Sequence, residues 1–381
     1  MSIPVVRERL ARTFIRLCEI DSPSRHEGEV AAYLHGKLMG LGAEVIIEDR
    51  SAMETGSEVG NMIVRFQARE SSGPPIFFVC HMDTVQPGCG VRVRREGDLF
   101  SSQGETILGG DDKSGIAALL EALQLIAESG VAHRTVELIL TTCEEIGLLG
   151  AKALEVHHLQ AEFGYALDSS GIDRVIVGAP AANGLEITIQ GLAAHAGLNP
   201  EDGISAIGLA AEAIVRLPLG RIDEQSTANL GLIQGGVATN IVPEQVVIRG
   251  EVRSHSEKKL AQHTENIQQI FERIVAYNPV KQKNGGERPT VEMKVVQEYP
   301  SMALAGSDPV VTLVRQAGKR LDRELEFLVA GGGSDANILN SYDLPTAIIA
   351  TGMTNVHTTE ESQDLNDLVS LTELLFELMT G

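Results

Sequence analysis

Histidine and carboxylate residues recur at the ends of the elements that the sequence predicts. They are His81 and Asp83 after the apolar run 76–80, Asp111 and Asp112 before a helix from Lys113, Glu144 and Glu145 after the run 136–143, Asp168 after 163–167, and His357 in the loop after 346–350. In open α/β sheets, ligands bind beyond the carboxyl ends of the strands. We therefore expect these side chains to converge at one edge of a sheet.

Two imidazoles and several carboxylates, with no cysteine among the candidate ligands, are typical of a hydrolytic zinc, manganese or cobalt site. There are enough carboxylates to bridge two ions, as in co-catalytic metal pairs. Each feature also has a structural explanation: a histidine after a strand often only hydrogen-bonds in its loop, paired acids before a helix are usually caps, and a Glu-Glu pair is usually solvated. The convergence of five such features favours the metal site.

His81 and Asp83 are two residues apart, a spacing that places side chains on the same side of an extended chain. We expect the Asp83 carboxylate to accept the free ring N–H of His81 and to fix its tautomer.

The charge balance and the cysteines indicate which partners and which cellular location to expect. The 381 residues include 52 acidic and 31 basic side chains, a net charge of −21 that disfavours nucleic acid as a partner. No apolar run approaches the length of a membrane span, and the first residues do not resemble a secretory signal. The four cysteines form no CxxC pair. These features predict a cytoplasmic protein with reduced thiols and no membrane association.

The alternation of elements predicts an α/β catalytic domain, formed by residues 1–178 and 305–381, with a mostly parallel sheet and helices on both faces. The short, continuous apolar runs are typical of strands that are buried on both sides. The predicted strands are 76–80, 136–143, 163–167 and 346–350, and the predicted helices are 4–18, 26–41, 113–128, 308–321 and a last helix from Leu365. Asp111 or Asp112 is expected to cap the helix from Lys113.

A second domain is predicted between two linkers, Gly178 to Gly184 and Tyr299 to Ser307. Residues 181–298 have the order β-α-β-β-α-β, which indicates a ferredoxin-like α+β unit. Its predicted elements are strands 185–190, 228–234, 245–253 and 290–298, and helices 203–217 and 257–277. One domain is therefore expected to be inserted in the other as a lid.

At the level of motifs, the sequence resembles peptidase T and its relatives, within the wider family of two-zinc aminopeptidases, carboxypeptidases, dipeptidases and N-acyl amino-acid deacylases. The segments that carry the resemblance are 81–85 (HMDTV), 108–115 (LGGDDKSG), 142–147 (TCEEIG), 166–168 (ALD) and 355–357 (NVH). They occur in the family's order and spacing and extend over the whole chain, including the inserted lid.

The resemblance implies a role for each matching residue. The metal ligands would be His81, Asp111, Glu145, Asp168 and His357, with two divalent ions, zinc in the first place and manganese or cobalt as alternatives. Asp111 would bridge the ions, Asp83 would orient His81, and Glu144 would be the general base toward a metal-activated water. The peptide bond between Asp111 and Asp112 is cis in the family.

His195 in the lid would stabilise the oxyanion, within its own chain or in the partner of a homodimer formed through the lid. Without the resemblance it is a histidine of a surface loop. Asn240 and Arg253 would contact substrate, Arg253 as a fork for a carboxylate, and otherwise it is a solvent-facing strand residue. Gly332 and Gly333 resemble the family's glycine-rich loop near the substrate.

The resulting prediction is a metal-dependent exopeptidase that releases the N-terminal residue of tripeptides or other short peptides. A dipeptidase, carboxypeptidase or N-acyl amino-acid deacylase with the same metal site is the alternative. A non-catalytic, metal-stabilised binding protein is a distant third. Glu144 argues against the last, because a structural site needs no base beside a complete set of ligands.

Overall fold

The structure is a computed structural model and describes residues 4–70, 73–277 and 288–381. The chain divides into two compact units, which are described separately: unit 1 comprises Met1–Ala179 and Met302–Gly381, and unit 2 comprises Pro180–Ser301. The predicted boundaries, at 178 and 305 for the first part and 181 and 298 for the second, lie close to these divisions.

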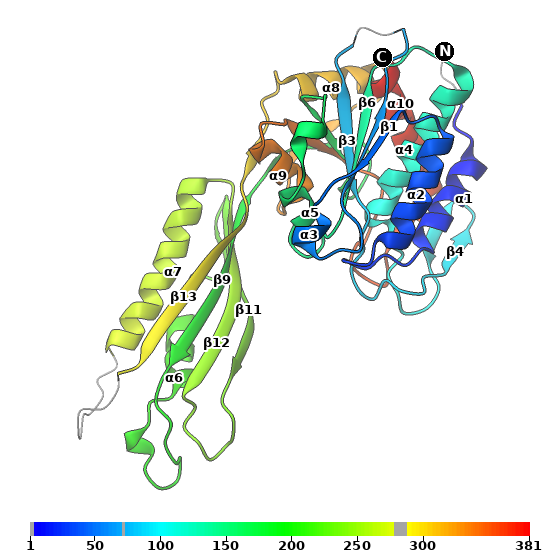
Figure 1. The fold of residues 1–381 in the computed structure, drawn as a ribbon. Helices are drawn as coiled ribbons and strands as arrows, with labels where there is room; N and C mark the ends of the chain where they lie inside the picture. Colours follow the sequence, from blue (N-terminus) through cyan, green and yellow to red (C-terminus); the bar gives the residue numbers. More distant parts are fainter. Residues whose placement is uncertain (1–3, 71–72, 278–287) are drawn as a thin grey trace. The chain divides into compact units, whose positions relative to one another are not determined.

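A nine-stranded sheet forms the middle of unit 1 (Figure 1). Its order is β1-β2-β6-β3-β7-β16-β8-β14, and β15 also pairs with β8. The four central strands β6, β3, β7 and β16 run parallel. β1 and β2 pair antiparallel at one side of them, and at the other side β8 pairs antiparallel with β16 and β14 but parallel with β15. The strands are β1 (Val45–Glu48), β2 (Met62–Phe66), β3 (Ile76–His81), β6 (Val136–Thr141), β7 (Gly164–Ala166), β8 (Arg174–Ala179), β14 (Met302–Ala303), β15 (Glu326–Val329) and β16 (Thr346–Ile349).

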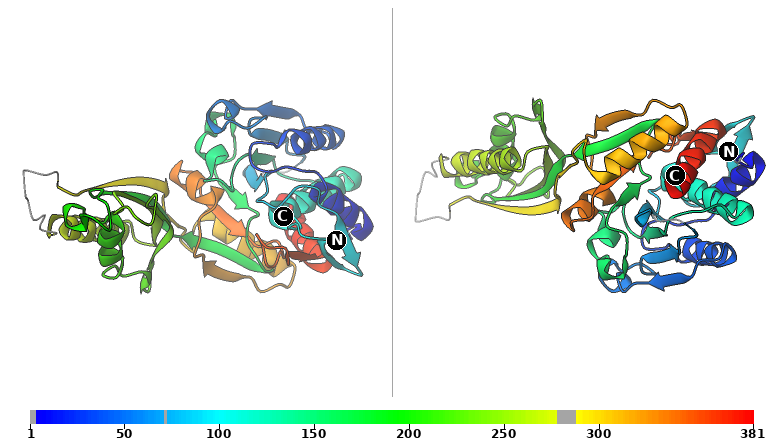
Figure 2. Two further views of the ribbon diagram at one scale, coloured as in Figure 1. Left: turned by 90° about the horizontal axis from the view of Figure 1, so that it is seen from below. Right: turned by 90° about the horizontal axis from the view of Figure 1, so that it is seen from above.

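Helices cover both faces of this sheet, as predicted. On β3, Phe78 and Cys80 pack into one core with α1, α2, α4, α8 and α10, and Phe77 and Val79 pack into a second core with α9. Figure 2 shows the first and last helices beside each other. The helices are α1 (Arg7–Cys18), α2 (Gly28–Gly40), α3 (Ala52–Thr55), α4 (Gly110–Ser129), α5 (Leu149–Lys152), α8 (Pro309–Arg320), α9 (Asp335–Ser341) and α10 (Leu365–Thr380). A small sheet of β4 (Val93–Glu96), β5 (Leu99–Ser102) and β17 (Ser362–Asp364) completes the unit.

The predicted linker from Gly178 to Gly184 is wrong. Gly178 lies within β8, which ends at Ala179, and only Pro180 separates β8 from β9 (Ala181–Gln190). Ala181 and Ala182 are buried, so a run of small residues that suggested a loop fits a covered strand instead. The second predicted linker, Tyr299 to Ser307, likewise contains β14.

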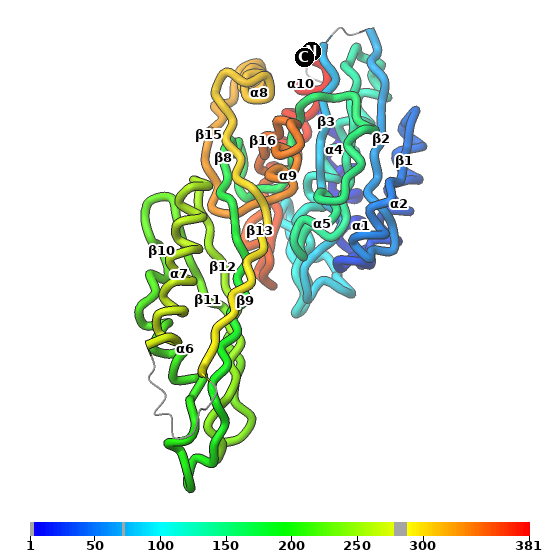
Figure 3. Tube along the Cα trace, turned by 60° about the vertical axis from the view of Figure 1, so that its left-hand side comes forward, coloured from blue at the N-terminus to red at the C-terminus, as the bar shows by residue number. Residues whose placement is uncertain are grey.

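Unit 2 is an antiparallel five-stranded sheet of order β10-β11-β12-β9-β13 with the helices α6 and α7. Figure 3 shows β9 and β13 running side by side. The elements are β9, α6 (Ala206–Ile214), β10 (Gly220–Asp223), β11 (Ser226–Gly235), β12 (Gln245–Ser254), α7 (Glu257–Tyr277) and β13 (Thr290–Tyr299). Apart from the short β10, this is the predicted ferredoxin-like order.

The core of unit 2 follows from the alternation of β9 and the helical period of α7. Leu185, Ile187 and Ile189 point to one face of the sheet, and Ile267 and Phe271 of α7 pack against that face. Within the described residues, no helix combines the length and apolar composition that crossing a bilayer requires.

Candidate metal centre and active site

Four segments that follow parallel strands of unit 1 bring predicted site residues to the carboxyl edge of the sheet, and the start of α4 adds Asp111. His81 is the last residue of β3 and pairs in register with Thr141, the last residue of β6. Glu144 follows β6, and Asp168 follows β7, which lies on the other side of β3. The loop after β16 carries His357. This convergence is a consequence of parallel pairing.

Asp111 faces two histidines with its two oxygens. Its Oδ1 lies 3.1 Å from His81 Nε2, and its Oδ2 lies 3.2 Å from His357 Nε2. His357 Nε2 also lies 3.1 Å from Glu145 Oε1. The Asp111–Asp112 peptide bond is cis, as the resemblance implied. Asp111 therefore stands between two groups of potential ligands, the arrangement expected of a bridging carboxylate.

The donor set fits divalent metal ions. One ligand atom from each of His81, Asp111 and Glu145 lies within 4.8 Å of the other two, which is close enough to hold one ion. Imidazole nitrogens and carboxylate oxygens are ligands that zinc and its neighbours accept. The residues that would hold ions are these three and His357, with Asp168 at the same edge of the sheet.

The pKa shifts at the site reflect the attraction between its carboxylates and its two imidazoles. The hydrogen bonds to Asp111 and Glu145 raise the pKa of His357 to about 10. Burial lowers the pKa of His81, but its carboxylate neighbours outweigh burial and leave that pKa well above its usual value. Burial also opposes ionisation of Asp111, yet the two histidines hold its pKa below the ordinary range. Without bound cations, protons on the histidines compensate the carboxylates.

The predicted partner of the His81 ring is wrong in detail. His81 Nδ1 lies 2.9 Å from the backbone oxygen of Asp83 and 3.6 Å from its carboxylate. The Asp83 carboxylate instead accepts the backbone N–H groups of Glu144 at 3.0 Å and Glu145 at 3.2 Å, and the hydroxyl of Ser24 at 2.6 Å. β3 ends at His81, so the regular alternation of side chains in a strand does not extend to Asp83.

Glu144 is 9% exposed, and burial raises the pKa of its carboxyl well above the usual value. A carboxylate with a raised pKa is a better proton acceptor, as general base catalysis requires.

Asp168 is half-buried, and burial and the nearby Asp111 raise its pKa well above the usual value. Asp168 lies at the predicted edge but outside the three-residue cluster of His81, Asp111 and Glu145.

Two buried carboxylates near the site were not predicted. Asp335 Oδ2 accepts the hydroxyl of Thr141 at 2.5 Å, next to His81 in the sheet. Glu361 accepts backbone N–H groups at the start of α4, including that of Asp111. The predicted cap is therefore wrong: α4 begins at Gly110, and its own first turn provides no side-chain cap.

Two predicted lid residues lie on adjoining loops of unit 2. His195 forms a bridge with Ile241, and the backbone oxygen of Asn240 accepts the N–H of Ala196 at 2.9 Å. His195 Nδ1 accepts the N–H groups of Gly197 and Leu198, each at 3.1 Å. Since Nδ1 is an acceptor, the ring proton of the neutral form lies on Nε2. His195 is exposed and presents a donor, as an oxyanion-stabilising role needs.

The remaining predicted contacts are less distinctive. Arg253 lies on β12 and donates to Glu251 at 3.0 Å. Gly332 and Gly333 lie in the loop between β15 and α9, where Ser334 caps α9.

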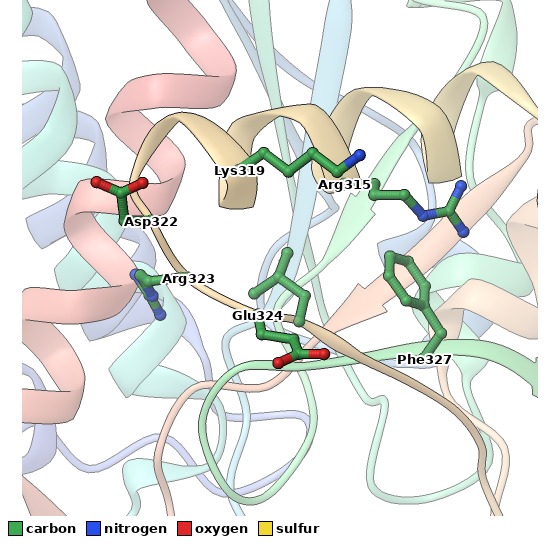
Figure 4. Close-up of a pocket in the computed structure, with 7 residues that line it drawn as sticks. Arg315, Lys319, Asp322, Arg323, Glu324 and Phe327 are labelled. Atoms are coloured by element: carbon green, nitrogen blue, oxygen red, sulfur yellow. The ribbon is translucent and has the colours of Figure 1, made fainter.

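Figure 4 shows a separate cavity of about 510 Å³ at α8 and β15, lined by Arg315, Lys319 and Phe327 among others. None of its lining residues is a predicted site residue.

The fold and the site define a metal-dependent hydrolase whose catalytic unit is interrupted by an inserted domain. The sequence matches the profile of peptidase family M20/M25/M40 over residues 77–381, and the chain belongs to this family. It is a peptide hydrolase of the peptidase T-like type.

Several known proteins are similar over nearly the whole chain. The uncharacterised protein YqjE of Bacillus subtilis is 39% identical over 376 residues, which cover 98% of each chain. The structure of a tripeptidase from Staphylococcus aureus superposes with a TM-score of 0.92 at 34% identity and covers 99% of this chain and 98% of that one. The structure of aminopeptidase PepT from Bacillus cereus gives a TM-score of 0.89 at 37% identity, with the same coverage.

Proposed function

We propose that the protein is a two-metal aminopeptidase that removes the N-terminal residue from tripeptides and other short peptides. The observation that carries the metal chemistry is the position of Asp111 between His81 and His357. The tripeptidase and the aminopeptidase with which the fold superposes support the substrate class. Zinc is the proposed metal, with manganese or cobalt as alternatives.

Divalent ions in this site would supply an acidified water and a Lewis acid for the scissile carbonyl. Glu144 is the residue of the chain that takes the proton during attack and passes it to the leaving amine. His195 Nε2–H is the donor for the developing oxyanion, with Asn240, Arg253 and the loop of Gly332 and Gly333 as substrate contacts. Asp83 holds the backbone of Glu144 and Glu145 in place.

A panel of substrates tests the activity. We expect hydrolysis of free tripeptides, and little or none of N-acetylated tripeptides, dipeptides and N-acyl amino acids, compared by kcat/KM. Glu144→Gln is the matched negative control, because it keeps the size of the side chain and removes the base. Preferred cleavage of dipeptides, or of N-blocked or N-acylated substrates, would replace the aminopeptidase by a dipeptidase, carboxypeptidase or deacylase.

We also propose a homodimer through unit 2. In the part of the chain that the structure describes, β10 pairs only with the first residues of β11. Beyond Ala228, the side of β11 that faces away from β12 is therefore an open sheet edge. Leu232 and Ile233 on this edge are 56% and 55% exposed. An open apolar edge is a template for pairing with another strand. Sedimentation velocity of the wild type and of Ile233→Lys tests it, and a monomeric wild type contradicts it.

Cytoplasmic location remains a prediction that the four free cysteines support.

A further inference from the structure

Glu361 supports the segment that carries Asp111. Its Oε2 accepts the backbone N–H groups of Leu108 at 2.9 Å and Gly109 at 2.8 Å, and its Oε1 accepts that of Asp111 at 3.1 Å. The residue is 1% exposed. A single buried carboxylate therefore receives three backbone donors next to the central ligand of the site.

These hydrogen bonds provide a cap that α4 lacks. The first N–H groups of a helix have no partner within it. Gly109, at the N-cap position, has no side chain to offer and a φ of 77°, and no side-chain cap bond is made there. A negative charge at this end also interacts favourably with the helix dipole. Glu361, 250 residues later in the sequence, takes the place of the missing cap.

The same loop also carries a predicted metal ligand. His357 precedes Glu361 by four residues, and its Nε2 lies 3.2 Å from Asp111 Oδ2. The loop thus contacts Asp111 twice, through an imidazole at its carboxylate and through a carboxylate at its backbone. These two contacts together hold His357 at a fixed distance from Asp111, although the two residues are far apart in the sequence.

The space around Glu361 leaves little freedom for the carboxylate. A Cβ atom added at Gly110 would lie 3.1 Å from Glu361 Oε1. That is closer than most such contacts, so a side chain at position 110 would push the carboxylate or the backbone aside. Gly110 therefore allows the close approach of Glu361 to the start of α4.

We propose that Glu361 is a positioning residue that sets the separation of Asp111 and His357 and thereby the affinity for the ion they share. The inference rests on the proposed function through the assignment of these two residues as ligands. Residues that orient metal ligands typically change metal affinity or activity 10- to 100-fold when they are mutated.

Titration of the chelator-treated full chain with Co²⁺, followed by visible absorption and elemental analysis, tests the proposal. Glu361→Gln keeps the side chain's size but replaces one acceptor oxygen by an amide that faces backbone N–H groups. We expect one of two Co²⁺ binding steps to weaken about 10- to 100-fold while the other is kept. At saturating metal, kcat falls and KM is retained.

Asp49→Asn is the matched control. Asp49 is also buried and accepts the backbone N–H groups of Ser51 and Asn61, but it is no predicted ligand or support of one. We expect this variant to lower the melting temperature and to keep both Co²⁺ steps. If Glu361→Gln behaves in the same way, the residue is only a helix cap and the proposal is overturned.

A second variant covers the case in which Glu361→Gln does not fold. Gly110→Ala keeps the carboxylate and crowds it, so weakening of the same Co²⁺ step supports the proposal and an unchanged titration overturns it. The titration needs no substrate. A wild type that binds two Co²⁺ ions but cleaves no peptide overturns the aminopeptidase proposal alone, and a wild type that binds none overturns both.

Discussion

The backbone N–H of Glu144 donates to the carboxylate of Asp83 at 3.0 Å. The proposed base is therefore fixed by its main chain, while its side chain remains available for proton transfer. Glu145 is held by the same carboxylate at 3.2 Å. Asp83 thus orients a base and a metal ligand together, besides accepting the His81 ring through its backbone oxygen.

We predict that Glu144→Gln abolishes most of the activity and leaves the metal content unchanged. Loss of a general base typically lowers kcat by about 10²- to 10⁴-fold. The replacement is nearly isosteric and introduces no buried charge, so the melting temperature should be retained. Steady-state kinetics with a tripeptide, together with elemental analysis, check this. Hydrolysis at a near-normal rate would show that the assigned base is wrong.

Asp83→Asn should reduce kcat about 10- to 100-fold, because the amide cannot accept from both Glu144 and Glu145 as the carboxylate does. Ser24→Ala is the control, since it removes only the hydroxyl that donates to Asp83 at 2.6 Å. We expect this variant to stay near the wild-type rate. Equal effects of both substitutions on kcat would mean that the hydrogen bonds from the backbone of Glu144 and Glu145 to Asp83 do not affect catalysis.

His357→Ala should reduce the metal content from about two ions per chain to about one, because His357 is the imidazole at the Oδ2 side of Asp111. Its side chain is 49% exposed, so the fold should tolerate the change. His26→Ala is a matched control: His26 also pairs with a carboxylate, Glu58, at 3.0 Å, but outside the cluster. Elemental analysis of the purified variants checks both, and full metal content in His357→Ala contradicts the assignment.

Most of the site residues that the sequence predicted follow a buried parallel strand, whereas Asp111 lies at the start of α4. The apolar run of β3 places His81, and that of β6 places Glu144, because such runs end where the chain emerges at the sheet edge. β2 was missed because Arg65 interrupts its apolar run, and its charge is compensated by the buried Glu137 of β6 at 2.7 Å. A pattern of residue types does not reveal such a pair.

Glu361 escaped prediction for a different reason. Its partners are backbone N–H groups at the start of α4, and backbone groups leave no signature in the sequence. The two acids at the start of the helix suggested a cap that they do not form, since Asp111 faces the histidines. Side-chain roles at a helix start depend on contacts between distant segments, which local rules do not include.

Metal binding should release protons and become tighter as the pH rises. In the metal-free protein the pKa of His357 is raised to about 10, so its ring is protonated at pH 7, and the neighbouring carboxylates raise the pKa of His81 as well. A metal ion binds only the neutral imidazole, so each ring gives up its proton. Below these pKa values, the binding constant should rise about tenfold per pH unit for each proton displaced.

Calorimetric titration with Zn²⁺ in buffers of different ionisation enthalpy, between pH 6 and 8, measures the protons released, and His357→Ala should release about one fewer. The same shift predicts the stability of the metal-free protein. The folded pKa of His357 lies above its usual value of 6.5, so its stabilising contribution is present below pH 6.5 and is lost as the pH rises toward 10. Metal binding that is independent of pH would contradict the proposed ligands, because protons and ions would then not compete for the same nitrogens.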